Sequence, residues 1–216
     1  MNLAVLIPAV LSYVRYTGGY ATKTKLLKLL YLLDIESFRE KQATLTDFNW
    51  RFHKYGPWSP EYDEVLDRLN NSNMISMRTG NKTEWDAVFV DAVKRVDLSE
   101  AFPAVLDELR ARRIIEAWAD RPTGELLEYV YFHTAPMRNA RRGELLDFSG
   151  ILGEEPVPEY KRTHSLVEPK ERKKKQKAFR EAIRQASNHP SGIHIRKPRY
   201  DAVFWKAIDT LDREPD

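Results

Sequence analysis

A leucine-rich segment from residue 23 to residue 39 constrains the fold of this chain more than any other feature. Lys25 and Lys28 form the only polar seam along it, and its leucines fall on nearly all other sides of a helix. A helix that is apolar over most of its circumference has to be buried. Thr22 is a suitable N-cap, because its side-chain oxygen can accept a hydrogen bond from the first turn. The sequence therefore predicts a helix from Lys23 to about Arg39 at the centre of the fold, and another from Leu3 to Tyr16 before it.

The segment from residue 44 to residue 58 has a different period. Phe48, Trp50 and Phe52 alternate with polar residues, which predicts an extended segment with one buried face. Tyr55-Gly56-Pro57 is expected to end this segment. Glycine permits backbone geometry closed to other residues, and proline fixes φ and removes a hydrogen-bond donor.

A helix and a hairpin are expected next. Ser59 as N-cap and Pro60 at the first helical position predict a helix start. The apolar face of this helix has the spacing i, i+3, i+4, i+7 and consists of Tyr62, Val65, Leu66 and Leu69. Residues 74 to 90 predict a β-hairpin that turns at Gly80-Asn81, a pair suited to a type II′ turn, and returns from Trp85.

Two longer helices follow in the sequence. Asp97 is a cap candidate, and residues 101 to 119 are expected to form one continuous helix, with Pro103 tolerated in its first turn. Its expected core positions are Phe102, Val105, Leu109 and Ile115. Thr123 is expected to cap a helix from Gly124 to His133, which Pro136 breaks.

Composition divides the chain near residue 150. Glu154-Glu155-Pro156-Val157-Pro158 reads as a linker. Residues 1–150 hold 20 basic and 21 acidic residues, whereas residues 151–216 hold 15 basic and 11 acidic ones. The fold class is therefore predicted as mainly α (α+β), with a compact helical domain over residues 1–150 and a small antiparallel β-hairpin. A basic helical extension over residues 151–216 is either a solvated arm or a site for nucleic acid or an acidic partner.

The sequence lacks the signatures of common catalytic and metal sites. It has no cysteine, which excludes disulfides and thiolate chemistry, and it contains no GxSxG, GxxxxGK[ST], GxGxxG or HExxH motif. Asp34 and Glu36 lie two residues apart on a helix and so do not share a face. We expect no catalytic, cofactor-binding or metal-binding residue. The N-terminal apolar run is far shorter than the ~20 residues that span a bilayer, so we expect no membrane partner and a cytoplasmic location.

Three pieces of the sequence, in this order and spacing, resemble the Panacea-domain (SocA-like) antitoxin family. The first is the run Lys25 to Asp34, KLLKLLYLLD, and the second is Tyr55-Gly56-Pro57 followed by Ser59-Pro60-Glu61. The third is the helix end Val130 to Thr134. The resemblance covers about residues 8 to 145. Trp58 departs from it, because the family often has a small aliphatic residue there.

The resemblance implies a mostly helical fold with a small antiparallel β element. It also implies a non-enzymatic antitoxin of a type II toxin–antitoxin system, which binds a cognate protein toxin encoded nearby. SocA-type members instead deliver their toxin to a bacterial AAA+ protease as adaptors. Such gene pairs are common on mobile genetic elements of phage and plasmid origin, which associates them with phage defence.

The residues chosen as partner-binding are Lys54, Tyr55, Gly56, Pro57 and Trp58. Rigid aromatic side chains beside a basic group are typical anchors of protein interfaces. The alternative is structural: Gly56 and Pro57 set the turn, and Tyr55 fills the core beneath it.

Two other classes of function compete with an antitoxin. Two helices followed by a hairpin resemble a winged-helix order, with Arg78 and Lys82 near the hairpin tip, which would suit a nucleic-acid-binding regulator. The basic extension could supply the charge that such a protein needs. A hydrolase with a dispersed site is the third candidate, and its residues would be His53, His133 and Glu61. The sequence specifies no oligomeric state.

Overall fold

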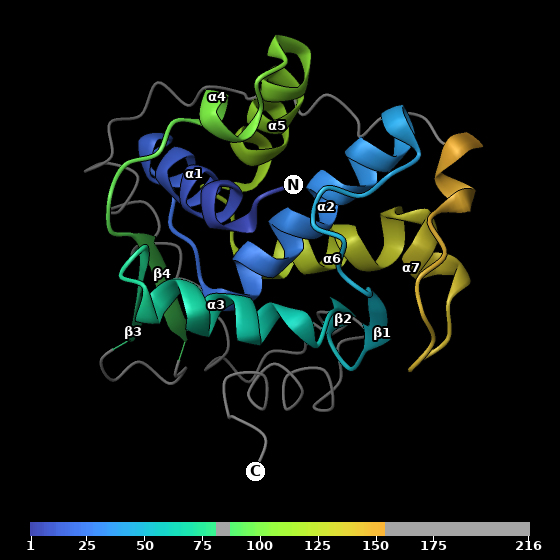
Figure 1. Ribbon diagram of the computed structural model, residues 1–216. Helices are drawn as coiled ribbons and strands as arrows, with labels where there is room; N and C mark the ends of the chain where they lie inside the picture. The colour runs from blue at the N-terminus through green and yellow to red at the C-terminus, as the bar shows by residue number, and fades with distance from the viewer. Residues whose placement is uncertain (81–86, 154–216) are drawn as a thin grey trace, which may run out of the picture. The chain divides into compact units, whose positions relative to one another are not determined.

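The computed structural model describes residues 1–80 and 87–153 (Figure 1). The predicted extension beyond residue 153, the predicted turn residue Asn81 and the nearby Lys82 lie outside them. The described residues are mainly helical with two small antiparallel sheets, which confirms the predicted fold class. Their elements are, in chain order, α1 (Leu3–Tyr16), α2 (Lys23–Lys41), β1 (Arg51–His53), β2 (Gly56–Trp58), α3 (Glu61–Asn71), β3 (Ile75–Thr79), β4 (Val88–Ala92), α4 (Leu98–Ala101), α5 (Val105–Trp118), α6 (Thr123–His133), α7 (Ala135–Asn139) and η1 (Ser149–Gly153).

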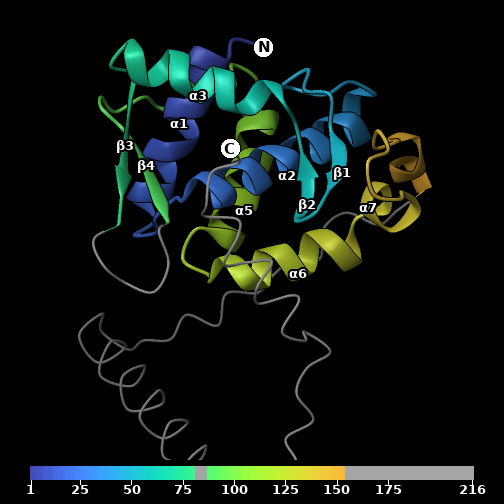
Figure 2. The same ribbon diagram turned by 90° about the horizontal axis from the view of Figure 1, so that it is seen from below.

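The leucine-rich helix α2 is the central element, as predicted. Every residue from Lys25 to Glu36 is buried. Helices α5 and α6 pack against it, and so does β2 (Figure 2). Thr22 caps the helix, since its hydroxyl accepts a hydrogen bond from the amide of Lys25 at 3.1 Å. Helix α1 has the predicted bounds.

The extended segment after α2 is a hairpin rather than one strand. Strands β1 and β2 are antiparallel, with Arg51 opposite Trp58 and His53 opposite Gly56. Gly56 and Pro57 therefore begin a return strand, which the sequence interpretation did not include. The segment before the turn has the buried face that the alternation predicts. Phe48 and Trp50 are buried, and Phe52 is half-buried.

Residues 143 to 146 lie along the edge of β1 that does not face β2. The amide of Leu146 donates to the carbonyl of Trp50 at 2.8 Å, and the amide of Phe52 donates to the carbonyl of Glu144 at 2.9 Å. Backbone groups of β1 are thus hydrogen-bonded on both sides. The end of the described chain fixes the hairpin against the core.

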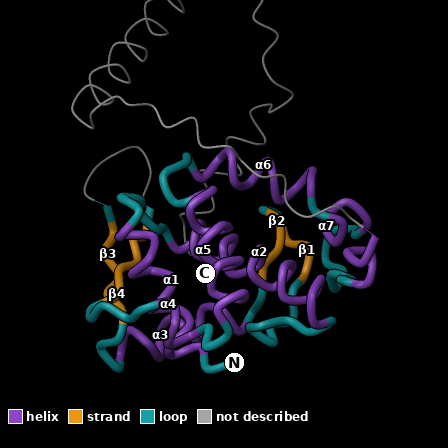
Figure 3. Tube along the Cα trace, turned by 90° about the horizontal axis from the view of Figure 1, so that it is seen from above, coloured by secondary structure: helices purple, strands orange, loops and turns teal. Residues whose placement is uncertain are grey.

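Helix α3 connects the two sheets, which lie on opposite sides of the helical core (Figure 3). Its predicted apolar face is buried. Ser59 does not cap it, because its hydroxyl donates to the carboxylate of Glu61. The second hairpin is confirmed as antiparallel, with Ile75 opposite Ala92. Strand β4 is described from Val88 onward, and Trp85 lies outside the described residues.

The predicted single helix from residue 101 to residue 119 is wrong. Helix α4 ends at Ala101 and α5 begins at Val105, because Phe102 leaves the helical conformation (φ −123°, ψ 83°) directly before Pro103. Phe102 and Ile115 are buried as predicted. Val105 and Leu109 are 69% and 54% exposed, so they are not core residues. Asp97 does cap α4, in a capping box with Glu100.

Helix α6 runs as predicted to His133, and Pro136 lies in the first turn of α7. Thr123 is the first residue of α6 rather than its cap, and Pro122 occupies the cap position. Within the part of the chain that the structure describes, no helix combines the length and the apolarity that crossing a membrane would require.

Candidate partner-binding site

A buried lysine attaches the β1–β2 hairpin to the central helix. The side-chain amine of Lys28 on α2 donates to the carbonyl oxygen of Pro57 at 2.6 Å. Lys28 is fully enclosed, and this burial lowers its pKa to about 7, because a charged amine loses its hydration there. The carbonyl of Pro57 is thus satisfied by a side chain of another element.

Gly56 lies where a larger residue would not fit. Its φ is +93°, in the region that favours glycine, and a Cβ atom there would lie 3.2 Å from the ring of Tyr131. The hydroxyl of Tyr131 donates to the carbonyl of Lys54 at 2.8 Å. Gly56 and Pro57 are buried, and the structure shows them setting the geometry of the turn. Contact between this pair and a partner stays a prediction.

The outer side of the hairpin carries aromatic rings. Lys54 is exposed, and Tyr55 and Trp58 are half-buried. The ring of His53 lies between the two aromatics, with its centroid 5.2 Å from that of Trp58 and 6.3 Å from that of Tyr55. We call His53, Lys54, Tyr55 and Trp58 the hairpin face.

The electrostatics of the hairpin face favour a neutral imidazole. Partial burial lowers the pKa of His53, and the positive charges of Lys28, Lys54 and Arg142 lower it further. The face therefore presents uncharged rings bordered by basic groups. That combination of aromatic anchors and a basic rim is common in protein interfaces.

Lys25, the other buried lysine of α2, also binds backbone carbonyls of another part of the chain. The amine of Lys25 donates to the carbonyls of Ala119 and Arg121 at 2.6 Å and 2.8 Å, and it lies 4.4 Å from the centre of the Tyr20 ring. Burial lowers its pKa to about 8. The chain also approaches closely here, because a Cβ atom on Gly19 would lie 2.3 Å from the Ala119 oxygen.

The carboxylates of α2 are engaged in structure as well. Asp34 accepts hydrogen bonds from the amides of Leu45 and Thr46 at 2.7 Å and 2.9 Å, and from the indole of Trp50 at 2.7 Å. Burial raises the pKa of Asp34. Glu36 forms ion pairs with arginines of α2 and α5. Asp34 thus fixes the loop that leads into β1.

The dispersed residues proposed for a hydrolase each have separate contacts. His53 lies in the hairpin face, His133 stacks on Tyr129 with ring centroids 5.5 Å apart, and Glu61 accepts from Asn49 and Ser59. Over residues 1–80 and 87–153, no cluster of three or more histidine, aspartate or glutamate side chains could hold a metal ion.

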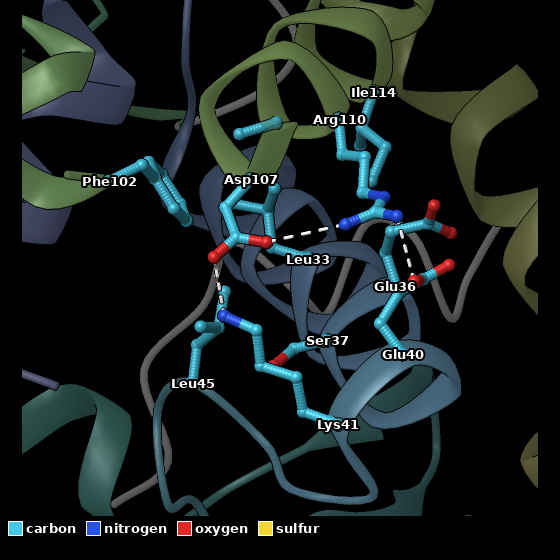
Figure 4. A pocket seen from close by; sticks show the side chains of 11 residues that line it. Leu33, Glu36, Ser37, Glu40, Lys41, Leu45, Phe102, Asp107, Arg110 and Ile114 are labelled. Atoms are coloured by element: carbon cyan, nitrogen blue, oxygen red, sulfur yellow. Dashed lines mark hydrogen bonds and ion pairs between the residues drawn. The ribbon is translucent and has the colours of Figure 1, made fainter. Parts of the chain in front are cut away.

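A small pocket between α2 and α5 is lined by ion-paired side chains (Figure 4). Asp107 binds Lys41 and lies 3.4 Å from Arg110. Arg110 in turn donates to Glu40 at 2.7 Å. The labelled charges point toward one another, so this network cross-links the two helices.

The family model described as antitoxin SocA-like, Panacea domain, matches residues 26–134. The chain belongs to this family. No curated protein and no solved structure matched the chain. The matched range begins in the first turns of α2 and ends directly after α6.

In this Panacea domain the three motif pieces of the sequence meet in space. Lys28 of the first piece donates to Pro57 of the second, and Tyr131 of the third packs on Gly56 and donates to Lys54. The three pieces are therefore joined to one another by hydrogen bonds and packing. These contacts hold the hairpin face in a fixed position.

Sequence reasoning missed two residues that the structure brings to the hairpin. The sequence indicates His53 only as a catalytic candidate, although it lies within two residues of Tyr55 in the same aromatic segment. Tyr131 belongs to a motif piece far along the chain, and no local pattern relates it to Gly56. The packing of α6 against β2 brings Tyr131 to the hairpin.

Proposed function

We propose that this protein is an antitoxin that neutralises a toxin encoded next to it by binding the toxin directly. Membership in the SocA-like antitoxin family supports the role. The single structural observation in favour of the mode is the hairpin face, where partly exposed rings lie outside a buried Gly56-Pro57 turn. Lys54, Tyr55 and Trp58 are the proposed contact residues.

The rigidity of the hairpin supports direct binding. Lys28 and Tyr131 hold the turn from inside through its backbone carbonyls. An aromatic side chain that is already positioned loses little conformational entropy when a partner covers it. Tyr55 and Trp58 are therefore suited to serve as anchors, and Lys54 supplies a charge that favours an acidic partner surface.

Delivery of the toxin to a bacterial AAA+ protease is a variant of the same proposal. It uses the same contact with the toxin but adds a protease-binding surface elsewhere on the chain. Toxin levels distinguish the two forms, because adaptor action lowers the amount of toxin protein whereas masking leaves it unchanged.

The test is co-expression with the neighbouring open reading frame. We expect the neighbour alone to stop growth and this protein to restore it. Tyr55→Ala and Trp58→Ala should reduce the rescue, because loss of an anchor at the centre of an interface costs on the order of 2 kcal/mol of binding. Growth curves and a pull-down of the tagged toxin measure both effects.

The matched control is Leu106→Ala, which removes a large exposed apolar side chain from α5, outside the hairpin face. This variant should rescue growth fully. Thermal unfolding of each purified variant separates loss of contact from loss of fold. A harmless neighbour, or a toxic one that this protein does not restrain, would refute the proposal.

A further inference from the structure

A concave surface lies at the far end of α3 from the hairpin face. It is a groove of about 470 Å³ between the last turns of α1 and the β3–β4 hairpin. An 11-residue helix is roughly 16 Å long, so the two surfaces are well separated. The groove is large enough for several side chains of a ligand.

The groove contains more positive than negative charge. Its lining includes Arg15, Arg78 and Arg95 but a single carboxylate, Asp91. Arg78 donates to one oxygen of Asp91, and Arg15 lies 3.7 Å from the other. Two guanidinium groups therefore share one carboxylate, while Arg95 is directed to Asp97.

The arginines retain donors for a ligand. The side chains of Arg15 and Arg78 are 77% and 67% exposed. Each guanidinium group has five N–H donors in a planar fork, and the shared contact with Asp91 uses only a few of them. A second carboxylate entering the groove would find both paired donors and uncompensated charge.

The groove also offers apolar surface beside the charge. Leu11 and Ala92 lie in its lining, and Tyr16 is 72% exposed. The ring of Tyr16 is stacked on that of Tyr13 with centroids 5.7 Å apart, so its orientation is supported from below. A matching ligand therefore combines carboxylates with an apolar or aromatic side chain.

We propose that this groove binds an acidic peptide segment of another protein. Nucleic acid also binds arginine, but a nucleic-acid reader is expected to show a broad basic surface, and residues 1–150 hold 20 basic against 21 acidic residues. The positive charge here is local, within a concavity that accommodates a few side chains. The site does not depend on the proposed antitoxin function.

The test uses the full chain and a short fluorescein-labelled peptide rich in aspartate and glutamate around one phenylalanine. Anisotropy should show saturable binding that the Arg15→Gln/Arg78→Gln double variant weakens roughly tenfold or more, because charge-assisted hydrogen bonds are lost. The same peptide with amides in place of its carboxylates should not bind. Arg138→Gln on α7, which removes an exposed arginine far from the groove, should leave the affinity unchanged.

Asp91→Asn provides a test that unfolding cannot imitate. This change removes the internal carboxylate that competes for Arg15 and Arg78, so the peptide should bind several-fold more tightly. Absence of saturable binding, or equal weakening by Arg138→Gln, would overturn the proposal. The proposal would also be overturned if a DNA duplex bound through Arg15 and Arg78 while the peptide did not bind. Growth rescue by the hairpin face is a separate readout, so failure here leaves the antitoxin proposal intact.

Discussion

At the scale of single residues, Lys28 has the most unusual environment. It is a buried amine held to the Pro57 carbonyl, and its pKa is lowered to about 7 from an ordinary value of 10.5. Between these two values the unfolded chain binds a proton that the folded chain has released. Stability therefore rises with pH across this window, and the cost of burying the charge is largest below pH 7. Lys25, with its pKa lowered to about 8, contributes in the same direction.

We predict that the free energy of unfolding increases between pH 7 and pH 9. A lysine that is neutral in the folded chain and protonated in the unfolded chain raises the free energy of unfolding by up to about 1.4 kcal/mol per pH unit. Urea unfolding at a series of pH values measures the slope. Lys28→Met should flatten it, and Lys23→Met is the matched control, since Lys23 is partly exposed in an ion pair with Asp63. An equally steep slope in Lys28→Met would contradict this account of the proton equilibrium.

The backbone roles of residues in the site can be predicted from the sequence, whereas their hydrogen-bond partners cannot. The backbone requirement at Gly56 and Pro57 is predictable, because glycine and proline have few roles in such a segment. The partner of Lys28 is not, since the sequence does not say which carbonyl a buried amine reaches. Asp34 is similar: its position on an apolar helix indicates burial, yet its donors at Leu45, Thr46 and Trp50 depend on the path of a loop.

At the scale of elements, α5 shows how a pattern fails. Phe102, Val105 and Leu109 are at helical spacing only if one helix runs through Pro103. The break after α4 changes the phase, so the residues of α5 that face the core are Ala111, Ile114, Ile115 and Trp118. The apolar residues of its first turns are left at the surface. Periodicity predicts a face correctly only within an uninterrupted helix.

This change of phase predicts which substitutions in α5 affect stability. Val105→Ala and Leu109→Ala should each change the free energy of unfolding by no more than about 0.5 kcal/mol, because both side chains are mostly exposed. Ile115→Ala, on the buried face of the same helix, should cost about 2–5 kcal/mol. Chemical denaturation measures all three. A large loss at Val105 would mean that this surface is covered in solution.

At the scale of the whole molecule, the central position of α2 and the mainly helical class were predictable from one apolar segment. The path of β2 and the assembly of the hairpin face were not. They depend on contacts between residues far apart in the sequence, such as Gly56 and Tyr131. Local periodicity carries no information about such pairs, whereas the order and spacing of three motif pieces indicated the family.

The charge distribution of the whole chain gives a further prediction. A chain ending at Gly153 lacks a segment with 15 basic and 11 acidic residues, and it retains the matched range 26–134. We expect this truncated chain to unfold in one cooperative transition and to restrain the toxin. Any retention on DNA at low salt should fall, because fewer phosphate contacts remain. Loss of rescue on truncation would assign the toxin contact to the extension instead.

The buried amine of Lys25 on α2 also has a consequence for synthesis of the chain. It binds the carbonyl of Ala119, which the ribosome adds 94 residues later. At about 5–20 residues per second, the interval is roughly 5–20 s. During that time the leucine-rich helix lacks the helices α5 and α6 that contact it in the folded chain. We therefore expect the nascent protein to expose an apolar surface for seconds, which would favour binding by chaperones that act at the ribosomal exit.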